Sequence, residues 1–374
     1  MTKATAKAKK PQRTAKGRKK PGRKVINVAL QGGGAHGAFT WGVLDALLAD
    51  ERIDIEGVSG TSAGAMNAAV MVQGLDTGGT GKARELLEEF WTRISQGGAY
   101  YTPAQSALTQ WANLMNPFRA AMVKADESAV FGMFETMARY MSPYQFNPLN
   151  INPLRDILAG ILDIPQIQNS KTVKLFITAT CVRTGIGRVF ENKEITVDTL
   201  LASATLPEMF QAVKIGKDYY WDGGYSGNPA LYPLFYDTRS RDILIVHVNP
   251  IMRQEIPQSA TAIDNRLNEI TFNGALLDEL RAIAFAKRLI TEGWLKDKYK
   301  SKIKNILIHA IRADKVLKDL SVASKMDTDW DFLISLRDLG RAEGENWIDR
   351  NYDAINERDT VDIRRDYLDI SAGG

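Results

Sequence analysis

The sequence predicts an α/β protein with three layers, in which helices cover both faces of a mostly parallel central sheet. Its 374 residues, 44% of them hydrophobic, suffice for one large domain with a sizeable core, or for two domains at most. Strand-like apolar segments alternate with helical segments up to about residue 350. Because the crossover between parallel strands is usually a helix, this alternation favours an α/β/α arrangement.

A glycine-rich loop follows the first expected strand. The strand covers residues 25–30, the loop (Gln-Gly-Gly-Gly-Ala-His-Gly) covers 31–37, and apolar residues spaced by three and four predict a helix over 38–49. A glycine loop that leads into a helix presents several unpaired N–H groups beside the positive end of the helix dipole. Such a loop can hold a phosphate group, or the oxyanion that develops when a serine attacks an ester.

Phosphate binding has a requirement that the sequence meets poorly. Gly32, Gly34 and Gly37 match the dinucleotide-binding fingerprint, which also needs an acidic residue about 20 positions later, at the end of the second strand. Asp54 and Glu56 lie at that distance, but at the start or middle of the second expected strand. A carboxylate there cannot reach a ribose, so the oxyanion interpretation is favoured and nucleotide binding is the alternative.

Ser62 lies in a Gly-x-Ser-x-Gly motif between an expected strand (53–58) and an expected helix (63–72). A serine at such a junction occupies a strained turn and presents its hydroxyl at the top of the sheet. Gly60 and Gly64 are needed because larger side chains would collide with the neighbouring strand and helix. The motif arises by chance in about one such sequence in ten, so its place between strand and helix is what makes Ser62 a candidate nucleophile.

Asp222 ends an expected hairpin, with strands at 213–215 and 218–221, and is followed by Gly223 and Gly224. A serine nucleophile needs a base within hydrogen-bonding reach. An aspartate packed under aromatic side chains loses hydration and becomes a better proton acceptor. An Asp-Gly pair alone is an ordinary turn, and it is the order of the three motifs that makes Asp222 a candidate base.

The glycine loop, the Gly-x-Ser-x-Gly motif and the Asp-Gly-Gly motif, in this order, resemble those of the patatin-like phospholipases. The resemblance covers roughly residues 25–320. The segment 201–210 (Leu-Ala-Ser-Ala-Thr-Leu-Pro-Glu-Met-Phe) is similar to the Ala-Ser-x-Ala-x-Pro-x-x-Phe segment that precedes the aspartate of the family. The resemblance implies a patatin-like fold and a Ser–Asp dyad without histidine, with Ser62 as nucleophile and Asp222 as general base.

The same resemblance implies roles for the glycines and for the histidine beside them. The backbone N–H groups of the loop form the oxyanion hole, and further motif glycines shape the site: the first set is Gly32, Gly33, Gly34 and Ala35, and the second is Gly37, Gly60, Gly64, Gly223 and Gly224. The family usually has Arg or Lys where His36 stands. We therefore expect His36 to orient or face the substrate, and any charge that it lends to the oxyanion to depend on pH, because histidine titrates near neutrality.

The other two histidines decide between a dyad and a Ser-His-Asp triad. His247 and His309 both lie within expected strands, at 242–248 and 305–311, whereas a triad histidine needs a loop beyond a strand end. We expect both to be core residues hydrogen-bonded to their neighbours. A triad esterase on the same fold is the alternative.

Residues 1–24 differ in composition from the rest of the chain. They contain eleven Lys or Arg and no acidic residue, and subtracting their charge from the formal net charge of +4 leaves −7 for residues 25–374. Such a segment is predicted to be a disordered basic tail. An anionic membrane surface is its favoured partner, nucleic acid is a weaker candidate, and a solvated extension with no partner is the third option.

Three observations bear on localisation. The apolar run at 25–30 is too short for a secretory signal and leads into the glycine loop. The sequence has no uninterrupted apolar stretch of 18 residues, so we expect no membrane-spanning segment. Cys181 is the only cysteine, which excludes an intramolecular disulfide and is compatible with a reducing compartment. We expect a cytoplasmic protein, with membrane association at most peripheral.

The segment 97–150 holds five of the eleven Met and many aromatic residues. Helices are expected at about 104–113 and 128–141, and Phe134 and Met137 lie on one apolar face of the second. Because Met is flexible and polarisable, we interpret the segment as a lid-like insertion in which these two residues face the substrate. An ordinary helical cover on the sheet is the alternative.

Together these features predict a serine acyl hydrolase that cleaves lipid carboxylic esters, of phospholipase A type. A catalytic domain at 25–320 would carry a helical extension, 321–374, packed on it. Thioesters or an intracellular polyester as substrates, and a non-catalytic lipid- or nucleotide-binding role, are the alternatives. No cofactor or metal is expected, because the acidic residues of a long amphipathic helix at 262–295 lack a metal-ligand spacing. The inward face of that helix is expected to include Leu267, Ile270, Leu277, Leu280 and Ile283.

Overall fold

The computed structural model describes residues 22–97, 141–300, 302–313, 317, 320 and 322–369. Most of the expected basic tail (residues 1–21) and most of the expected lid, including Phe134 and Met137, lie outside the described residues. The predictions made for those two segments therefore stay predictions.

An eight-stranded mixed sheet forms the centre of the molecule, in the order β5-β6-β3-β2-β1-β7-β8, with β4 also paired to β3. The pairs β1–β2, β1–β7, β2–β3 and β7–β8 are parallel, whereas β3–β4, β3–β6 and β5–β6 are antiparallel. The strands are β1 (Lys24–Leu30), β2 (Ile53–Gly60), β3 (Lys174–Cys181), β4 (Gly187–Glu191), β5 (Val213–Ile215), β6 (Asp218–Asp222), β7 (Asp242–His247) and β8 (Leu307–Arg312).

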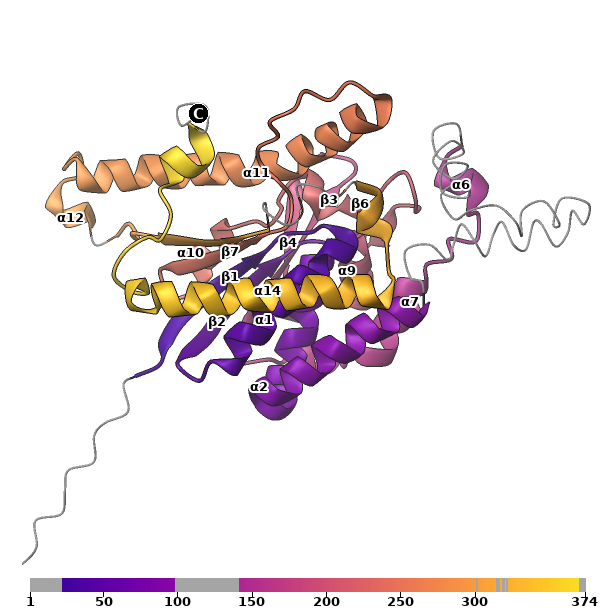
Figure 1. The fold of residues 1–374 in the computed structure, drawn as a ribbon, viewed down its shortest axis with the longest axis horizontal. Helices are drawn as coiled ribbons and strands as arrows, with labels where there is room; N and C mark the ends of the chain where they lie inside the picture. The colour runs from indigo at the N-terminus through magenta and orange to yellow at the C-terminus, as the bar shows by residue number, and fades with distance from the viewer. Residues whose placement is uncertain are drawn as a thin grey trace, which may run out of the picture.

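Helices connect the strands and cover the sheet (Figure 1). They are α1 (Gly37–Ala49), α2 (Ala63–Gly97), α6 (Pro143–Phe146), α7 (Pro153–Ile161), α8 (Ile164–Gln168), α9 (Val197–Ser203), α10 (Tyr232–Asp237), α11 (Ala260–Thr291), α12 (Asp297–Lys300) and α14 (Trp330–Asn351). Short helical turns include η1 (Gly34–His36), η3 (Gly223–Tyr225), η4 (Val322–Met326) and η6 (Arg364–Leu368). The α2 helix is interrupted at Gly78 and Gly79, whose backbone angles are not helical.

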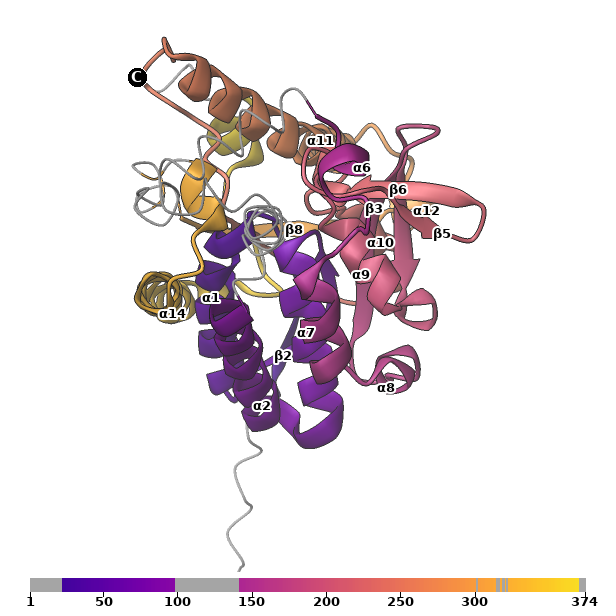
Figure 2. The same ribbon diagram turned by 90° about the vertical axis from the view of Figure 1, so that its right-hand side faces the viewer.

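Two hydrophobic clusters separate the three layers. Alternate residues of β1 face opposite sides of the sheet, so Val28 packs with α1, α2 and α14 in one cluster, while Ala29 packs with α10 and α11 in the other. Figure 2 shows α1, α2 and α14 grouped together, with α10 and α11 on the other side of the strands. The predicted α/β/α arrangement is therefore confirmed.

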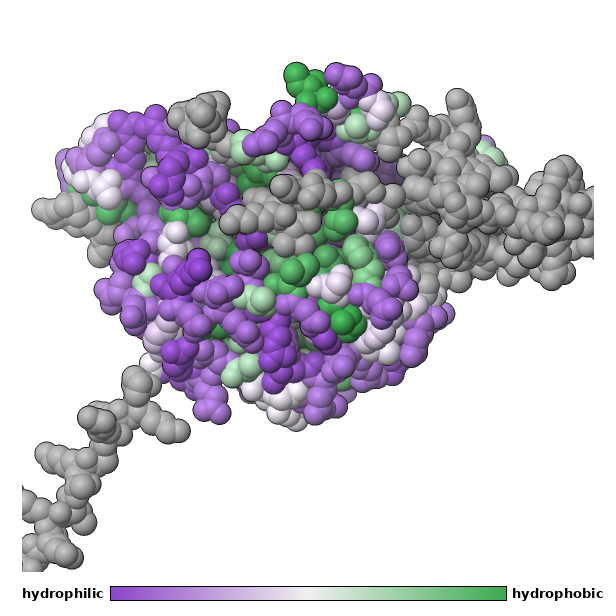
Figure 3. Space-filling model, in the orientation of Figure 1, coloured by the Kyte–Doolittle hydropathy of each residue, from purple (hydrophilic) through white to green (hydrophobic). Residues whose placement is uncertain are grey.

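The carboxy-terminal helix α14 lies along α1 (Figure 1), and the two helices approach very closely. A Cβ on Gly42 would lie within 1.9 Å of the Arg337 carbonyl oxygen, and one on Gly340 within 2.0 Å of the Phe39 carbonyl oxygen. Glycine on both helices therefore permits backbone contact. Hydrophilic residues cover most of the surface on this side, and hydrophobic residues show between them in the middle of the face (Figure 3).

Two expectations about packing were wrong. Leu267 and Ile270 were expected to face inward, but they are 56% and 52% exposed. The expected Leu280 and Ile283 are buried, Leu277 is partly buried, and Phe272 and Leu276 complete the buried apolar residues of α11. Leu267 and Ile270 are exposed because the amino-terminal part of the helix rises away from the sheet (Figure 1).

The expected basic tail also extends one residue too far. Lys24 begins β1, and its ammonium group donates hydrogen bonds to the carbonyl oxygens of Tyr352 and Ile355 at 2.8 and 3.0 Å. A cation with backbone partners on the carboxy-terminal segment belongs to the folded body. Among the described residues, no helix combines the length and apolarity needed to cross a bilayer.

Candidate active site

Ser62 occupies the turn between β2 and α2, at the carboxyl end of the parallel strands. Its φ of 54° lies in the left-handed region, which non-glycine residues adopt only under strain. The turn needs glycine on both sides, because a Cβ on Gly60 would lie 2.5 Å from the Gly64 carbonyl oxygen and one on Gly64 would lie 2.3 Å from the Leu30 carbonyl oxygen. The Ser62 N–H donates to the Ser203 hydroxyl of α9 at 2.9 Å, which ties the strained turn to a second element.

Asp222 is the last residue of β6 and is 1% exposed. Its carboxylate accepts a hydrogen bond from the Gly224 N–H at 2.7 Å and lies within hydrogen-bonding reach of the Ser62 hydroxyl. Burial raises the pKa of Asp222 to about 7, against the lowering effects of the Gly224 and Ser62 hydrogen bonds and of the Lys325 cation. The structure thus brings together an alcohol and a carboxylate that are 160 positions apart in the sequence.

Close packing holds the strand end of Asp222 against the Ser62 turn. A Cβ on Gly223 would lie 2.1 Å from the Thr178 carbonyl oxygen of β3 and 2.9 Å from the Thr61 side chain. A Cβ on Gly224 would lie 2.2 Å from the Phe272 ring of α11. Glycines at 223 and 224 therefore let the aspartate strand approach both the sheet and the turn.

The glycine loop lies directly beside Ser62, since a Cβ on Gly32 would come within 2.7 Å of the Ser62 Cβ. Two buried asparagines fix the first glycine: the Gly32 N–H donates to Asn228 Oδ1 at 2.6 Å, and its carbonyl accepts from Asn249 Nδ2 at 2.6 Å. Within the described residues, the N–H groups of Gly33, Gly34 and Ala35 donate to no acceptor. Three donors without an acceptor in the described part of the chain, beside a serine, make this loop able to bind an anionic oxygen.

His36 differs from its expected behaviour. It is 3% exposed, and its Nε2 atom forms a 2.8 Å hydrogen bond with the Ser324 hydroxyl of η4. Burial and the nearby Lys325 cation lower the pKa of His36 to about 3. The imidazole is therefore neutral throughout the physiological range, and the expected pH-dependent charge on this side chain is absent.

A cation that the sequence analysis did not single out lies close by. Lys325, in η4, is part-buried and donates hydrogen bonds to Asn249 Oδ1 at 2.8 Å and to Asn268 Oδ1 at 3.2 Å. Its carbonyl oxygen packs on the loop, because a Cβ on Gly34 would lie 2.2 Å from it. Burial lowers the pKa of Lys325 to about 8, opposed by the attraction of Glu269 and Asp222.

The remaining two histidines are in the core, as expected. His247, at the end of β7, bonds the Tyr367 hydroxyl at 2.8 Å, and burial with the nearby Arg312 lowers its pKa to about 3. His309, in β8, bonds Asp242 Oδ1 at 3.0 Å and Thr360 Oγ1 at 3.1 Å. Each ring is held by groups outside the Ser62–Asp222 pair, so the geometry offers no triad histidine from these two residues.

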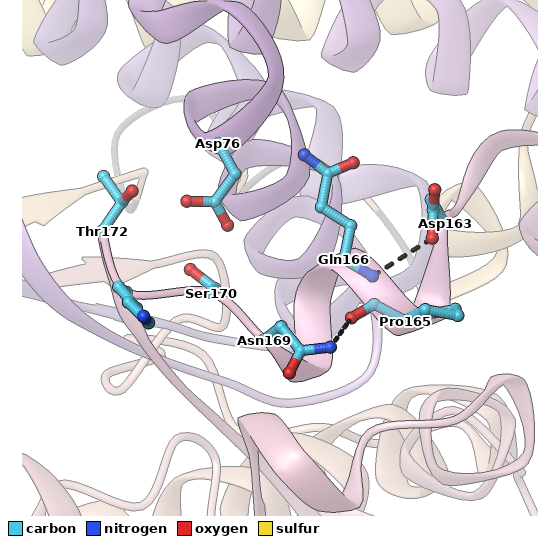
Figure 4. A pocket seen from close by; sticks show the side chains of 8 residues that line it. Asp76, Asp163, Pro165, Gln166, Asn169, Ser170 and Thr172 are labelled. Carbon is cyan, nitrogen blue, oxygen red and sulfur yellow. Dashed lines mark hydrogen bonds between the residues drawn. The ribbon is translucent and has the colours of Figure 1, made fainter.

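A surface hollow of about 550 Å³ lies elsewhere, between the α2 helix and the α8 region (Figure 4). Its lining includes Asp76, Asp163, Gln166 and Asn169, and none of the residues predicted for the site. Asp163 caps α8 by accepting a hydrogen bond from the Gln166 N–H, so this carboxylate already has a structural role.

Sequence reasoning missed several polar residues that shape the site: Ser203, Asn228, Asn249 and Lys325. Ser203 was within reach, because it belongs to the 201–210 segment already noted beside the motifs. The Asn228 and Asn249 side chains are buried, and buried amides in loops have no periodic signature. Lys325 is one of many lysines, and only the packing of η4 on the loop distinguishes it.

Fold and site together define a class: an α/β protein with a serine in a strained strand-to-helix turn, a buried aspartate and a glycine loop with free N–H donors. The sequence model of the family "Patatin-like phospholipase" matches residues 28–234, which is more than half of the chain. The chain therefore belongs to the patatin-like phospholipase family, whose members are lipid acyl hydrolases.

Among solved structures, the chain is similar to VipD from Legionella pneumophila, with 15% sequence identity and a TM-score of 0.33. The match covers 84% of this chain and 66% of the VipD chain, just under two thirds of its length. A likeness this distant carries no argument about function. Among curated proteins, none matches the chain.

Proposed function

We propose that this protein is a serine acyl hydrolase that cleaves lipid carboxylic esters with Ser62 as nucleophile and Asp222 as general base. One observation carries the proposal: the hydroxyl of a strained serine lies within reach of a buried carboxylate whose pKa is raised to about 7. A base is most effective when its pKa lies near the working pH. At neutral pH a substantial fraction of Asp222 is ionised and ready to accept the serine proton.

In the acylation step, Ser62 Oγ forms a bond to the ester carbonyl carbon while its proton passes to Asp222. The carbonyl oxygen becomes an oxyanion, which the N–H groups of Gly33, Gly34 and Ala35 would stabilise. When this intermediate collapses, the bond to the alcohol breaks and the alcohol leaves with the proton from Asp222. The fatty acyl group stays on the serine.

Deacylation repeats the sequence with water. Water attacks the acyl carbonyl and gives a proton to Asp222, and the same loop N–H groups hold the second oxyanion. The Ser62–acyl bond then breaks, the acid leaves, and Ser62 recovers the proton. No step in this sequence uses a histidine, which agrees with the hydrogen bonds that hold the rings of His247 and His309 on Tyr367 and Asp242.

A fluorophosphonate probe tests the proposal, because it reacts with activated serine nucleophiles. We expect the wild type to be labelled and to hydrolyse p-nitrophenyl fatty esters, and both Ser62→Ala and Asp222→Asn to lose hydrolysis while remaining folded. His309→Gln serves as a control outside the site. Absence of labelling in the wild type, or labelling that persists in Ser62→Ala, would refute the assignment.

Measuring hydrolysis of a panel of purified phospholipids, acylglycerols and acyl thioesters identifies the substrate class. The family membership supports lipid esters. Faster turnover of thioesters than of every lipid ester, measured as kcat/KM, would replace the lipid-ester assignment and leave the proposed dyad in place.

A further inference from the structure

Lys325 is a part-buried cation without a carboxylate partner among the described residues. Its ammonium group bonds two neutral amide oxygens, those of Asn249 and Asn268, and no carboxylate of the described residues lies within ion-pair distance. The nearby Glu269 carboxylate is already paired with Arg253 at 2.6 Å and Arg266 at 3.0 Å. Partly burying a charge that has no paired carboxylate costs free energy, so stability alone does not explain this lysine.

A short chain of hydrogen bonds links this ammonium group to the oxyanion loop. Lys325 Nζ donates to Asn249 Oδ1 at 2.8 Å, and Asn249 Nδ2 donates to the Gly32 carbonyl oxygen at 2.6 Å. The Lys325 ammonium group thus polarises the Asn249 amide, and the same amide holds the Gly32 carbonyl oxygen by a hydrogen bond. Hydrogen bonds in such a chain strengthen one another in a low-dielectric interior.

Through the geometry of the peptide bond, this chain of hydrogen bonds sets the direction of the Gly33 N–H group. The Gly32 carbonyl and the Gly33 N–H belong to one planar peptide unit, in which the two groups point in opposite directions. Fixing the carbonyl on Asn249 therefore fixes the direction of the Gly33 N–H. The Gly32 N–H is held independently by Asn228 at 2.6 Å, so the peptide planes on both sides of this glycine are restrained.

We propose that Lys325 is a positioning residue of the oxyanion hole, acting through Asn249 to aim the Gly33 N–H and adding a positive charge beside the loop. This inference rests on the proposed hydrolase function. The positive charge comes from a segment beyond residues 28–234, the part that matches the family, and it stands beside the loop where His36 is neutral. The carboxy-terminal segment therefore completes the active site.

The charged and titratable groups that face Lys325 come from several elements. Asp222 of β6 and Glu269 of α11 attract its ammonium group. Arg253, in the segment after β7, repels it, and His36 of η1 is neutral. The Lys325 pKa of about 8 keeps the ammonium group charged at neutral pH and discharges it in mildly alkaline solution. Turnover should therefore fall as pH rises above about 8.

The side chain can be tested separately from the backbone. The contact between η4 and Gly34 uses the Lys325 carbonyl oxygen, so a substitution at 325 leaves it in place. Lys325→Met keeps a side chain of similar length but removes the positive charge and the hydrogen-bond donors. Lys325→Arg keeps the positive charge and hydrogen-bond donors. Lys304→Met is a matched control, because Lys304 is also part-buried and bonds backbone carbonyls, and it precedes β8 at the amino ends of the parallel strands, whereas Ser62 lies at their carboxyl ends.

The experiment measures p-nitrophenyl ester hydrolysis and the rate of fluorophosphonate labelling for the full-length chain, with thermal melting as the folding check. We expect Lys325→Met to lose about 10- to 100-fold in kcat with KM changed less than about 3-fold, as for a misaligned catalytic group. Lys325→Arg should recover most of that loss and Lys304→Met should match the wild type. The fall in wild-type kcat above pH 8 should be absent in Lys325→Met.

The outcomes separate this inference from the function on which it rests. A wild type that is labelled at Ser62, together with a folded Lys325→Met whose kcat and pH profile match it, overturns the role of Lys325 alone. Equal losses in Lys325→Met and Lys325→Arg also overturn it. If Lys325→Met does not fold, the pH dependence of kcat in the wild type tests the inference, and a kcat that stays level up to about pH 10 overturns it. A wild type without labelling refutes the hydrolase function itself.

Discussion

The buried Asp222 should make the wild type less stable as pH rises, and Asp222→Asn should remove that loss. The folded-state pKa of about 7 lies above the usual aspartate value of 3.8, so the folded protein binds this proton more tightly than the unfolded chain does. Stability linked to Asp222 is therefore complete below pH 3.8 and declines until pH passes 7. The asparagine has no proton to lose, and its side-chain oxygen can still accept the hydrogen bond from the Gly224 N–H.

The size of the effect follows from the two pKa values. A separation of about 3 pKa units corresponds to about 4 kcal/mol at full ionisation, since each unit is worth about 1.4 kcal/mol. About half of this cost is already present at pH 5.5. The advantage of Asp222→Asn over the wild type should therefore grow by about 2 kcal/mol between pH 5.5 and pH 8.5.

Urea denaturation of both proteins at these two pH values measures the difference in the free energy of unfolding. Glu279→Gln is the matched control, because burial also raises the pKa of Glu279 to about 7, but its carboxylate bonds the Leu231 and Tyr232 N–H groups instead of Ser62. The control should show the same direction of stabilisation and keep ester hydrolysis. An Asp222→Asn advantage that is equal at both pH values would refute the raised pKa and, with it, the argument that burial tunes the base.

Three further predictions use other contacts of the site. Gly34→Ala places a Cβ 2.2 Å from the Lys325 carbonyl oxygen, at a residue whose φ is 57°. We expect a lower melting temperature and a loss of kcat of at least about 10-fold, as when one oxyanion-hole donor is misplaced. Unchanged kinetics would contradict the close packing of η4 on the loop. His247→Phe should keep fluorophosphonate labelling although it loses the Tyr367 hydrogen bond, and a folded variant that is not labelled would favour a triad. Gly64→Ala brings a Cβ to 2.3 Å from the Leu30 carbonyl oxygen, so the free energy of unfolding measured in urea should fall by about 1–3 kcal/mol. An unchanged free energy of unfolding would argue against the tight strand-to-helix turn.

Local patterns predicted the elements that frame the site. The apolar segments at 25–30 and 53–58 form β1 and β2, and the hairpin at 213–221 forms β5 and β6. These predictions succeed because a buried strand is a short apolar run between turn residues, whatever its neighbours are. The glycines flanking Ser62 were equally readable, since a close backbone approach excludes every larger side chain.

Burial changed the chemistry that residue type suggested. His36 was expected to titrate near neutrality, but desolvation and the Lys325 cation keep it neutral. Asp222 was expected to be a better base than a solvated carboxylate, and its raised pKa agrees with this. The two cases differ because the apolar residues before Asp222 already indicated a buried strand end, whereas the hydrogen-bond partner of His36 comes from η4, almost 290 positions later.

The sequence by itself determined the order of strands and helices, the strained turn at Ser62 and the glycine-rich loop, because these depend on residues that are neighbours along the chain. Only the tertiary structure decided which groups surround them. Lys325, Asn249 and Asn228 reach the loop from segments far away in the sequence, and their charges and hydrogen bonds act only over a few ångströms. Distance in space, which one linear sequence does not state, therefore sets the electrostatics of this site.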